Sequence, residues 1–306
     1  MYLEFFHLNR EPFTLTPDTR FFLDSGPFKD ALETLTVAIN NGEGFIKVTG
    51  EVGTGKTLLC RKVLNSVSDD IITAYIPNPN ISSKTLTLAL AKELGIRFPT
   101  SAIEYTLQQM ITRKLIEHYN NHKKVILCID EAQAMPDKTL ESLRLLTNLE
   151  TEKSKLLQVI LFGQPELDEK LQLKHLRQLR QRVSFSFELK RLEQGVMIDY
   201  LTHRLTIAGY TGSELFQLSA IKLLHHYSRG IPRLINVIVH KALILCYGKG
   251  LQQISKAIMK QAISDTEDAY YGIEKRESKY QLYPYWISLT SFIMIMLLSI
   301  GYWVLQ

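Results

Sequence analysis

The sequence contains only three cysteines, Cys60, Cys128 and Cys246, and their spacing matches no metal-binding pattern. All three lie in apolar stretches, which favours reduced, buried thiols of a cytosolic domain over a redox or metal role. A signal peptide is also missing, because residues 1–10 are aromatic and mixed in charge, with no basic flank before an apolar run. We therefore expect the bulk of the chain to stay in the cytosol.

Internal repeats, low-complexity tracts and signatures of nucleic-acid binding are absent as well. No helix-turn-helix, zinc or RNA-binding motif is present, so a nucleic-acid partner is not expected. The net charge of +5 is a mild bias that permits an anionic partner without requiring one. With 45% hydrophobic and 22% charged residues among 306, the composition excludes a disordered chain and suits about two compact domains.

Charge disappears altogether at the carboxyl-terminal end. No charged residue occurs between Tyr280 and Gln306, and residues 286–305 are mostly apolar. As a helix this segment would measure about 30 Å, the thickness of the hydrocarbon core of a bilayer. The aromatic residues that mark its two edges are Tyr283, Tyr285, Trp286, Tyr302 and Trp303. We predict a transmembrane helix at 286–305, with a buried core helix as the alternative.

The basic residues Lys275, Arg276 and Lys279 precede this segment, and nothing basic follows it. Positive charge is retained on the cytoplasmic side of a membrane. This asymmetry predicts a single-pass protein of the bacterial inner membrane, with the bulk of the chain cytoplasmic and residues 271–285 as a juxtamembrane linker.

Between these ends, short apolar segments alternate with helical patterns. This alternation predicts a parallel sheet between layers of helices, over residues 27–191. The predicted strands are 45–49, 71–76, 125–129, 157–162 and 183–189, and the predicted helices are around 56–67, 84–94, 104–120 and 138–149.

The remaining segments flank this α/β domain. Residues 1–26, here called the lead-in, are rich in aromatic and turn residues and are expected to be ordered. After about Leu192 the strand pattern stops, which predicts a smaller all-helical domain over 192–270, here called the lid. Its predicted helices are 194–208, 214–228, 232–247 and 255–270.

Residues 50–57 (GEVGTGKT) match the phosphate-binding loop pattern G-x-x-x-x-G-K-[ST], between an apolar strand and an apolar helix. Backbone N–H groups and the helix N-terminus would surround the phosphates. Lys56 would reach the β- and γ-phosphates, and the Thr57 hydroxyl would ligate Mg²⁺. The predicted ATP-binding residues are Gly50, Glu51, Val52, Gly53, Thr54, Gly55, Lys56, Thr57 and Leu58.

A second motif, residues 125–131 (VILCIDE), is an apolar strand that ends in two acids. It lies well downstream of the phosphate-binding loop and before a predicted helix. Asp130 would hold Mg²⁺ through water, and Glu131 would polarise the attacking water. The presence of Glu131 favours hydrolysis of ATP over binding alone.

Three further positions complete the predicted site. Gln164, after the fourth strand, would orient the attacking water beside the γ-phosphate. One of Arg177, Arg180 and Arg182 would act as an arginine finger on a neighbouring subunit, with Arg182 or Arg180 preferred. Pro232 suits a first helical turn, so Arg233 would reach back to the γ-phosphate from the lid.

Together these residues resemble the AAA+ ATPases, and more narrowly the ExeA/GspA-like secretion ATPases, with most likeness to members that serve MSHA pilus biogenesis. The resemblance covers about residues 1–265. It is carried by the stretches 6–18 (FHLNREPFTLTPD), 42–59 (GEGFIKVTGEVGTGKTLL), 129–135 (IDEAQAM), 145–150 (LLTNLE), 161–167 (LFGQPEL), 179–183 (LRQRV) and 228–236 (SRGIPRLIN).

The resemblance implies a homo-oligomer that works with pilus or secretion proteins at the inner membrane of a Gram-negative cell. Larger members carry a peptidoglycan-binding region after the membrane helix, and that activity is not expected here because this sequence stops at Gln306. Two alternatives stay open. One is a DNA-binding AAA+ ATPase of the transposition-helper type, and the other is an ATP-sensing scaffold with little turnover.

Overall fold

A computed structural model of the chain describes residues 2–99, 103–147, 149–150 and 154–270. The predicted linker at 271–285 and the predicted transmembrane helix at 286–305 lie outside these residues. Among the helices of the described part, none has the length and apolar character needed to cross a membrane.

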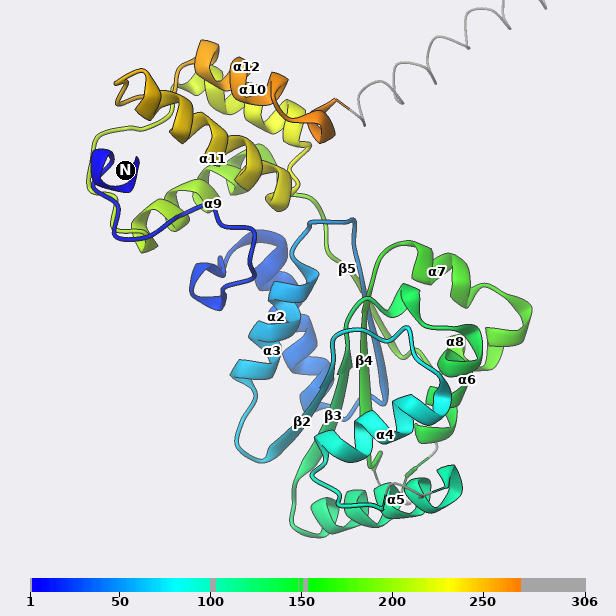
Figure 1. Cartoon of the computed structure of the whole chain (residues 1–306). Helices are drawn as coiled ribbons and strands as arrows, with labels where there is room; N and C mark the ends of the chain where they lie inside the picture. Colours follow the sequence, from blue (N-terminus) through cyan, green and yellow to red (C-terminus); the bar gives the residue numbers. More distant parts are fainter. Residues whose placement is uncertain (1, 100–102, 148, 151–153, 271–306) are drawn as a thin grey trace, which may run out of the picture.

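Five parallel strands form one sheet in the order β2-β3-β4-β1-β5, as Figure 1 shows. The three central strands are buried on both faces, which explains why their sequences are nearly continuous apolar runs. The strands are β1 (Phe45–Thr49), β2 (Ile71–Ile76), β3 (Lys124–Ile129), β4 (Gln158–Gly163) and β5 (Phe185–Glu188).

Strand β5 is shorter than the predicted segment 183–189, and it is not buried on both faces. Its side chains alternate between half-buried and exposed. β5 lies at the edge of the sheet, where Phe185 and Phe187 pack on the core on the α2 side, whereas Ser186 and Glu188 point to the other face and are exposed. The apolar content of the segment did not distinguish an edge strand from a central one.

Helices cover both faces of the sheet (Figure 1). Alternate side chains of the central strands pack against α2 and α3 on one face and against α4, α5 and α6 on the other. Cys60, Cys128 and Cys246 are buried and unpaired, which confirms the prediction of buried thiols. The helices are α2 (Gly26–Asn40), α3 (Lys56–Ser66), α4 (Ser83–Glu93), α5 (Glu104–Asn120) and α6 (Asp137–Leu146). Helix α6 ends three residues before the predicted limit at 149.

After β5 the chain forms the helices α9, α10, α11 and α12. Helices α10 and α12 are shorter than predicted. Residues 214–217 are extended, so α10 begins only at Leu218. Asp265 caps the end of α12, which therefore stops at Ser264. Phe216, in the extended segment, forms a bridge with Ile254. The bounds are α9 (Gln194–Ile207), α10 (Leu218–Ser228), α11 (Pro232–Gly248) and α12 (Lys256–Ser264).

The lead-in runs along the lid helices, beside α9 and α11 in Figure 1. Its helix α1 (Tyr2–Phe5) contacts α11, and its aromatic residues Phe6 and Phe13 are buried. The guanidinium of Arg204 on α9 donates a hydrogen bond to the Pro12 carbonyl oxygen at 2.5 Å and lies 4.6 Å from the centre of the Phe21 ring. These contacts hold the lead-in against the lid.

Candidate nucleotide-binding site

The phosphate-binding loop connects β1 to α3, at the carboxyl edge of the sheet. Gly53 and Gly55 have φ angles of 80° and 102°, a region that favours glycine. A Cβ atom on Gly53 would lie 2.8 Å from Cβ of Arg233, and one on Gly55 would lie 2.9 Å from a ring carbon of Phe28. The close approach of the lid and of α2 therefore requires glycine at both positions.

Lys56 begins α3, and its side chain is buried in the loop. Its ammonium donates hydrogen bonds to the carbonyl oxygens of Gly50 at 2.8 Å and Glu51 at 2.9 Å. Burial lowers the pKa of Lys56, while the nearby carboxylates of Glu131 and Asp130 act in the opposite direction. The cation is thus fixed beside the loop whose N–H groups would surround a phosphate.

Thr57 and Asp130 are directly hydrogen-bonded across the site. The Thr57 hydroxyl donates to the Asp130 carboxylate at 2.7 Å, and the backbone N–H of Glu131 donates to the same carboxylate at 2.9 Å. Burial raises the pKa of Asp130, and these two hydrogen bonds oppose that rise.

The hydroxyl and carboxylate of this pair are the hard oxygen ligands that Mg²⁺ prefers. In the described part of the chain, no three His, Cys, Asp or Glu side chains gather where they could hold a metal. A Mg²⁺ ion here would therefore take most of its ligands from phosphate and water, as Mg²⁺ does at nucleotide sites. The residues present fit such an ion.

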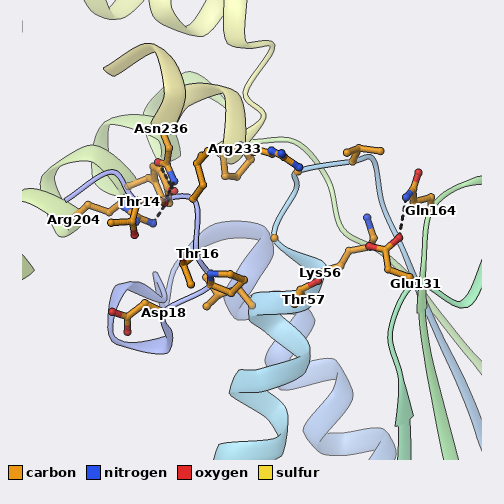
Figure 2. Close-up of a pocket in the computed structure, with 18 residues that line it drawn as sticks. Thr14, Thr16, Asp18, Lys56, Thr57, Glu131, Gln164, Arg204, Arg233 and Asn236 are labelled. Atoms are coloured by element: carbon orange, nitrogen blue, oxygen red, sulfur yellow. Dashed lines mark hydrogen bonds between the residues drawn. The ribbon is translucent and has the colours of Figure 1, made fainter. Parts of the chain in front are cut away.

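Glu131 adopts a left-handed backbone conformation (φ 51°), which is uncommon for a residue with a side chain. Its carboxylate accepts hydrogen bonds from the amide of Gln133 at 2.5 Å and from the amide of Gln164 at 3.0 Å. Figure 2 shows the Gln164 contact beside Lys56. Sequence reasoning placed Gln164 at the site but missed Gln133, although it lies in the quoted stretch 129–135.

The loop that carries Gln133 is held by neighbouring elements. The Lys170 ammonium, from α7 (Glu166–Leu171), donates to the carbonyl oxygens of Gln133 at 2.9 Å and of Met135 at 2.5 Å. The side-chain oxygen of Gln133 also accepts from the backbone N–H of Gln164 at 3.0 Å. The ends of β3 and β4 are therefore bonded to each other around Glu131.

A pocket of about 290 Å³ joins these groups to the lead-in and the lid (Figure 2). Lys56, Thr57, Glu131 and Gln164 line one end. The opposite wall, which sequence reasoning missed, is formed by lead-in and lid residues including Thr14, Thr16, Asp18, Tyr200, Arg204 and Asn236. Of these, the lead-in residues lie in the stretch 6–18 and Asn236 in the stretch 228–236, both marked by the family resemblance, whereas Tyr200 and Arg204 lie in neither.

Arg233 lines the pocket from α11, and its backbone N–H donates to the Gly53 carbonyl oxygen at 3.1 Å; its contact with a γ-phosphate stays a prediction. Glu51 instead turns away, and its carboxylate pairs with Arg191 at 3.3 Å.

The three candidate finger residues do not reach this pocket. Arg177 and Arg180 lie in α8 (Arg177–Arg180) and are exposed, and Arg182 is half-buried just before β5. None of them lines the pocket of its own chain.

The parallel sheet, the loop between β1 and α3, and the acids after β3 define a P-loop nucleotide-binding protein of the AAA+ class. Residues 39–171 match the family described as AAA domain. The chain also shares 38% identity over 254 residues with general secretion pathway protein A of Aeromonas hydrophila. That alignment covers 83% of this chain but 46% of the relative, so this chain spans about half of the relative's length.

Solved structures show the same fold at low identity. Cdc6p from Pyrobaculum aerophilum matches with a TM-score of 0.63 and 16% identity, covering 82% of this chain and 71% of that one. The ORC2 protein of Aeropyrum pernix, in its ADPNP–ADP complexes, matches with a TM-score of 0.61 and 16% identity, covering 84% and 71%. The α/β domain is therefore an AAA+ P-loop domain, and over 254 residues the chain is similar to a general secretion pathway protein A.

The contact between Gly53 and Arg233 leads to a first prediction. Gly53→Ala should weaken the binding of fluorescent mant-ATP by about tenfold or more. Alanine is strained at this φ angle, and its methyl group would collide with Arg233 of the lid. Gly195→Ala is the control, since a Cβ there meets nothing within 4 Å. Fluorescence titration measures both affinities, and equal affinities for the two variants would contradict the described contact.

Proposed function

We propose that the protein binds ATP with Mg²⁺ and hydrolyses it. The observation that carries this proposal is the hydrogen bond between Thr57 and Asp130 inside a pocket that also contains Lys56 and Glu131. Lys56 binds the β- and γ-phosphates, and the Thr57 hydroxyl and Asp130 hold the metal. Bound Mg²⁺ would neutralise charge on the phosphate oxygens.

Glu131 then has the role of the base. Its carboxylate orients the attacking water and accepts its proton, and the amides of Gln133 and Gln164 fix the position of that carboxylate. Arg233 adds positive charge from the lid side of the pocket. The left-handed backbone of Glu131 turns its side chain toward the pocket immediately after the buried strand.

Completion of the site requires a second subunit. Arg177, Arg180 and Arg182 lie outside the pocket of their own chain, and two of them are exposed. An arginine from a neighbouring subunit can stabilise the transition state for phosphoryl transfer by several kcal/mol. We therefore propose a homo-oligomer in which Arg182 or Arg180 of one subunit enters the nucleotide site of the next.

The chemistry of Glu131 gives a second prediction. Glu131→Gln should lower the rate of phosphate release by about 10²-fold or more while ATP still binds, because the base is lost and the phosphate contacts remain. Lys56→Ala should lose ATP binding itself. Phosphate release and mant-ATP titration on the same preparations separate the two defects.

The control for these two variants is the wild-type, full-length chain at several protein concentrations. A range of concentrations is needed because a lone subunit lacks the arginine that a neighbouring subunit would supply. If the wild-type chain releases phosphate no faster than Lys56→Ala at every concentration, the hydrolysis proposal is wrong. The protein would then be a scaffold that senses ATP.

A third prediction concerns the arginine from the neighbour. Arg182→Ala and Lys56→Ala should each be nearly inactive alone, but a mixture should regain turnover. In the mixture, Lys56→Ala subunits supply Arg182 to the intact nucleotide sites of their neighbours. Phosphate release at constant total protein is the measurement.

Mixtures of Lys56→Ala with Arg180→Ala or with Arg177→Ala, in place of Arg182→Ala, show which of the three arginines acts as the finger. If no mixture exceeds the summed activity of its two components, the finger is not supplied between subunits.

We further propose that hydrolysis supports assembly of a type IV pilus or a type II secretion complex at the bacterial inner membrane. Support comes from the relationship to general secretion pathway protein A and from the uncharged segment 286–305. The narrower likeness is to the MSHA pilus biogenesis protein MshM, whose name indicates a role in building that pilus. The direct partners would be inner-membrane pilus or secretion proteins.

A fourth prediction tests the membrane anchor. The full-length chain should remain in the membrane pellet of a bacterial lysate after a carbonate wash, because about 20 apolar residues anchor a helix in a bilayer. Deletion of residues 286–305 should release the protein to the supernatant. Full-length Lys56→Ala is the control and should stay in the pellet. Extraction of the full-length chain by carbonate would refute the anchor.

A further inference from the structure

A second, larger groove of about 860 Å³ lies on the outer side of the phosphate-binding loop, at the junction with the lid. Its cationic side chains come from the segment after β5 and from α10 and α11. Its apolar surface comes from the loop and from α11. The lining includes Arg191, Arg229, Arg233, His225, His226, Val52, Ile231, Leu234 and Val237, together with the acids Glu51 and Asp268.

Arg229 differs from the other residues of this groove in its backbone conformation and in having a buried nitrogen without a hydrogen-bond partner. Its backbone is left-handed (φ 55°), at the end of α10, where glycine would be unstrained. Nη2 donates to the Asp268 carbonyl oxygen at 3.2 Å, whereas Nη1 is buried and has no acceptor within the described residues. Burial lowers the pKa of Arg229, and the nearby Arg191 guanidinium lowers it further. The carboxylates of Asp268 and Glu51 act on this pKa in the opposite direction, but neither is hydrogen-bonded to Nη1.

Glu51 shows how an anionic acceptor would bind. Its carboxylate lies 3.3 Å from the Arg191 guanidinium, and the two side chains are 52% and 45% exposed. An ion pair this exposed is weak, so another carboxylate can replace it at little cost. The next residue, Val52, is also exposed and apolar. The groove therefore offers guanidinium groups beside an uncovered apolar surface.

We propose that this groove binds an acidic segment of a partner protein, one that carries carboxylates together with an apolar side chain. One carboxylate takes the place of Glu51 at Arg191 and another pairs with the Arg229 guanidinium, while the apolar side chain covers Val52 and Val237. Charge and apolar surface lie side by side, which is the pattern of a peptide-binding groove.

A nucleic acid fits this groove less well. The acids Glu51 and Asp268 interrupt the row of arginines, so the groove does not offer a continuous cationic track. Binding of single strands also relies on a continuous cationic track with aromatic rings on which bases stack. The apolar residues that line the groove are aliphatic, and no Phe, Tyr or Trp is among its described lining residues.

The groove and the nucleotide pocket share two residues, Val52 and Arg233. Val52 belongs to the phosphate-binding loop itself, and the Arg233 backbone is hydrogen-bonded to Gly53. A segment bound in the groove thus contacts the loop that holds the phosphates. Coupling of this kind is reciprocal, so ATP must change the affinity for the segment as much as the segment changes the affinity for ATP.

The test uses the full-length chain and three labelled probes in fluorescence anisotropy. The first is a peptide of repeated Glu-Glu-Leu, the second its Lys-Lys-Leu counterpart, and the third an oligothymidine of similar length. We expect saturable binding of the acidic peptide only. Arg191→Glu should weaken this binding by about tenfold or more, since an attractive contact becomes repulsive. The exposed Arg97, outside the groove, provides the matched control Arg97→Glu.

Arg229→Gly is a second variant that suits the left-handed backbone, so it separates loss of the ligand contact from loss of folding. This variant should also weaken binding of the acidic peptide. Its melting curve, followed by circular dichroism, should be unchanged. The proposal is overturned if the acidic peptide fails to saturate by about 1 mM, the weak limit of specific binding. It is equally overturned if Arg97→Glu weakens binding as much as Arg191→Glu, or if the oligothymidine binds in an Arg191-dependent manner. These experiments measure peptide binding and not ATP turnover. A negative result would therefore overturn the groove proposal without bearing on the proposal of ATP hydrolysis.

Discussion

Strands β3, β4 and β1 lie side by side and run parallel, so their carboxyl ends meet at one edge of the sheet. Each strand delivers one part of the site there: the phosphate-binding loop follows β1, Asp130 and Glu131 follow β3, and Gln164 follows β4. The hydrogen bond from Thr57 to Asp130 joins parts that are 73 residues apart in sequence. The site depends on this strand order, because no local segment could bring its members together.

A second constraint is the shared core of the α/β domain, the lead-in and the lid. Phe28 on α2, Phe13 in the lead-in and Tyr200 on α9 belong to one cluster of buried residues. The lid is therefore packed against the sheet domain near the phosphate-binding loop, and the contact between Gly53 and Arg233 lies at that boundary. A movement of the lid must change the surroundings of the loop, since interiors pack too tightly to absorb it.

Local patterns predicted the five strands and the longer helices between them, but not the short helices α7 and α8. The strand limits of β1 and β2 agree with their apolar runs, and the loop motif located Lys56 and Thr57. The opposite wall could not be predicted, because its contacts join distant residues. Arg204 reaches Pro12 across 192 positions, and Asn236 reaches Thr14 across 222. Gln133 was missed although it lies in the quoted stretch 129–135, because that stretch does not show which of its side chains faces Glu131.

The charged groups at the phosphate end differ in how they respond to an anion. Lys56 is bonded to neutral carbonyl oxygens, whereas a phosphate adds the attraction between opposite charges. A phosphate therefore competes well for its ammonium. Glu131 is bonded to the neutral amides of Gln133 and Gln164, and a phosphate repels its carboxylate. Binding of an anion thus draws Lys56 away from the loop carbonyls while it leaves Glu131 with its two glutamines. In the mechanism proposed above, Glu131 therefore keeps its position as the base while the phosphates bind.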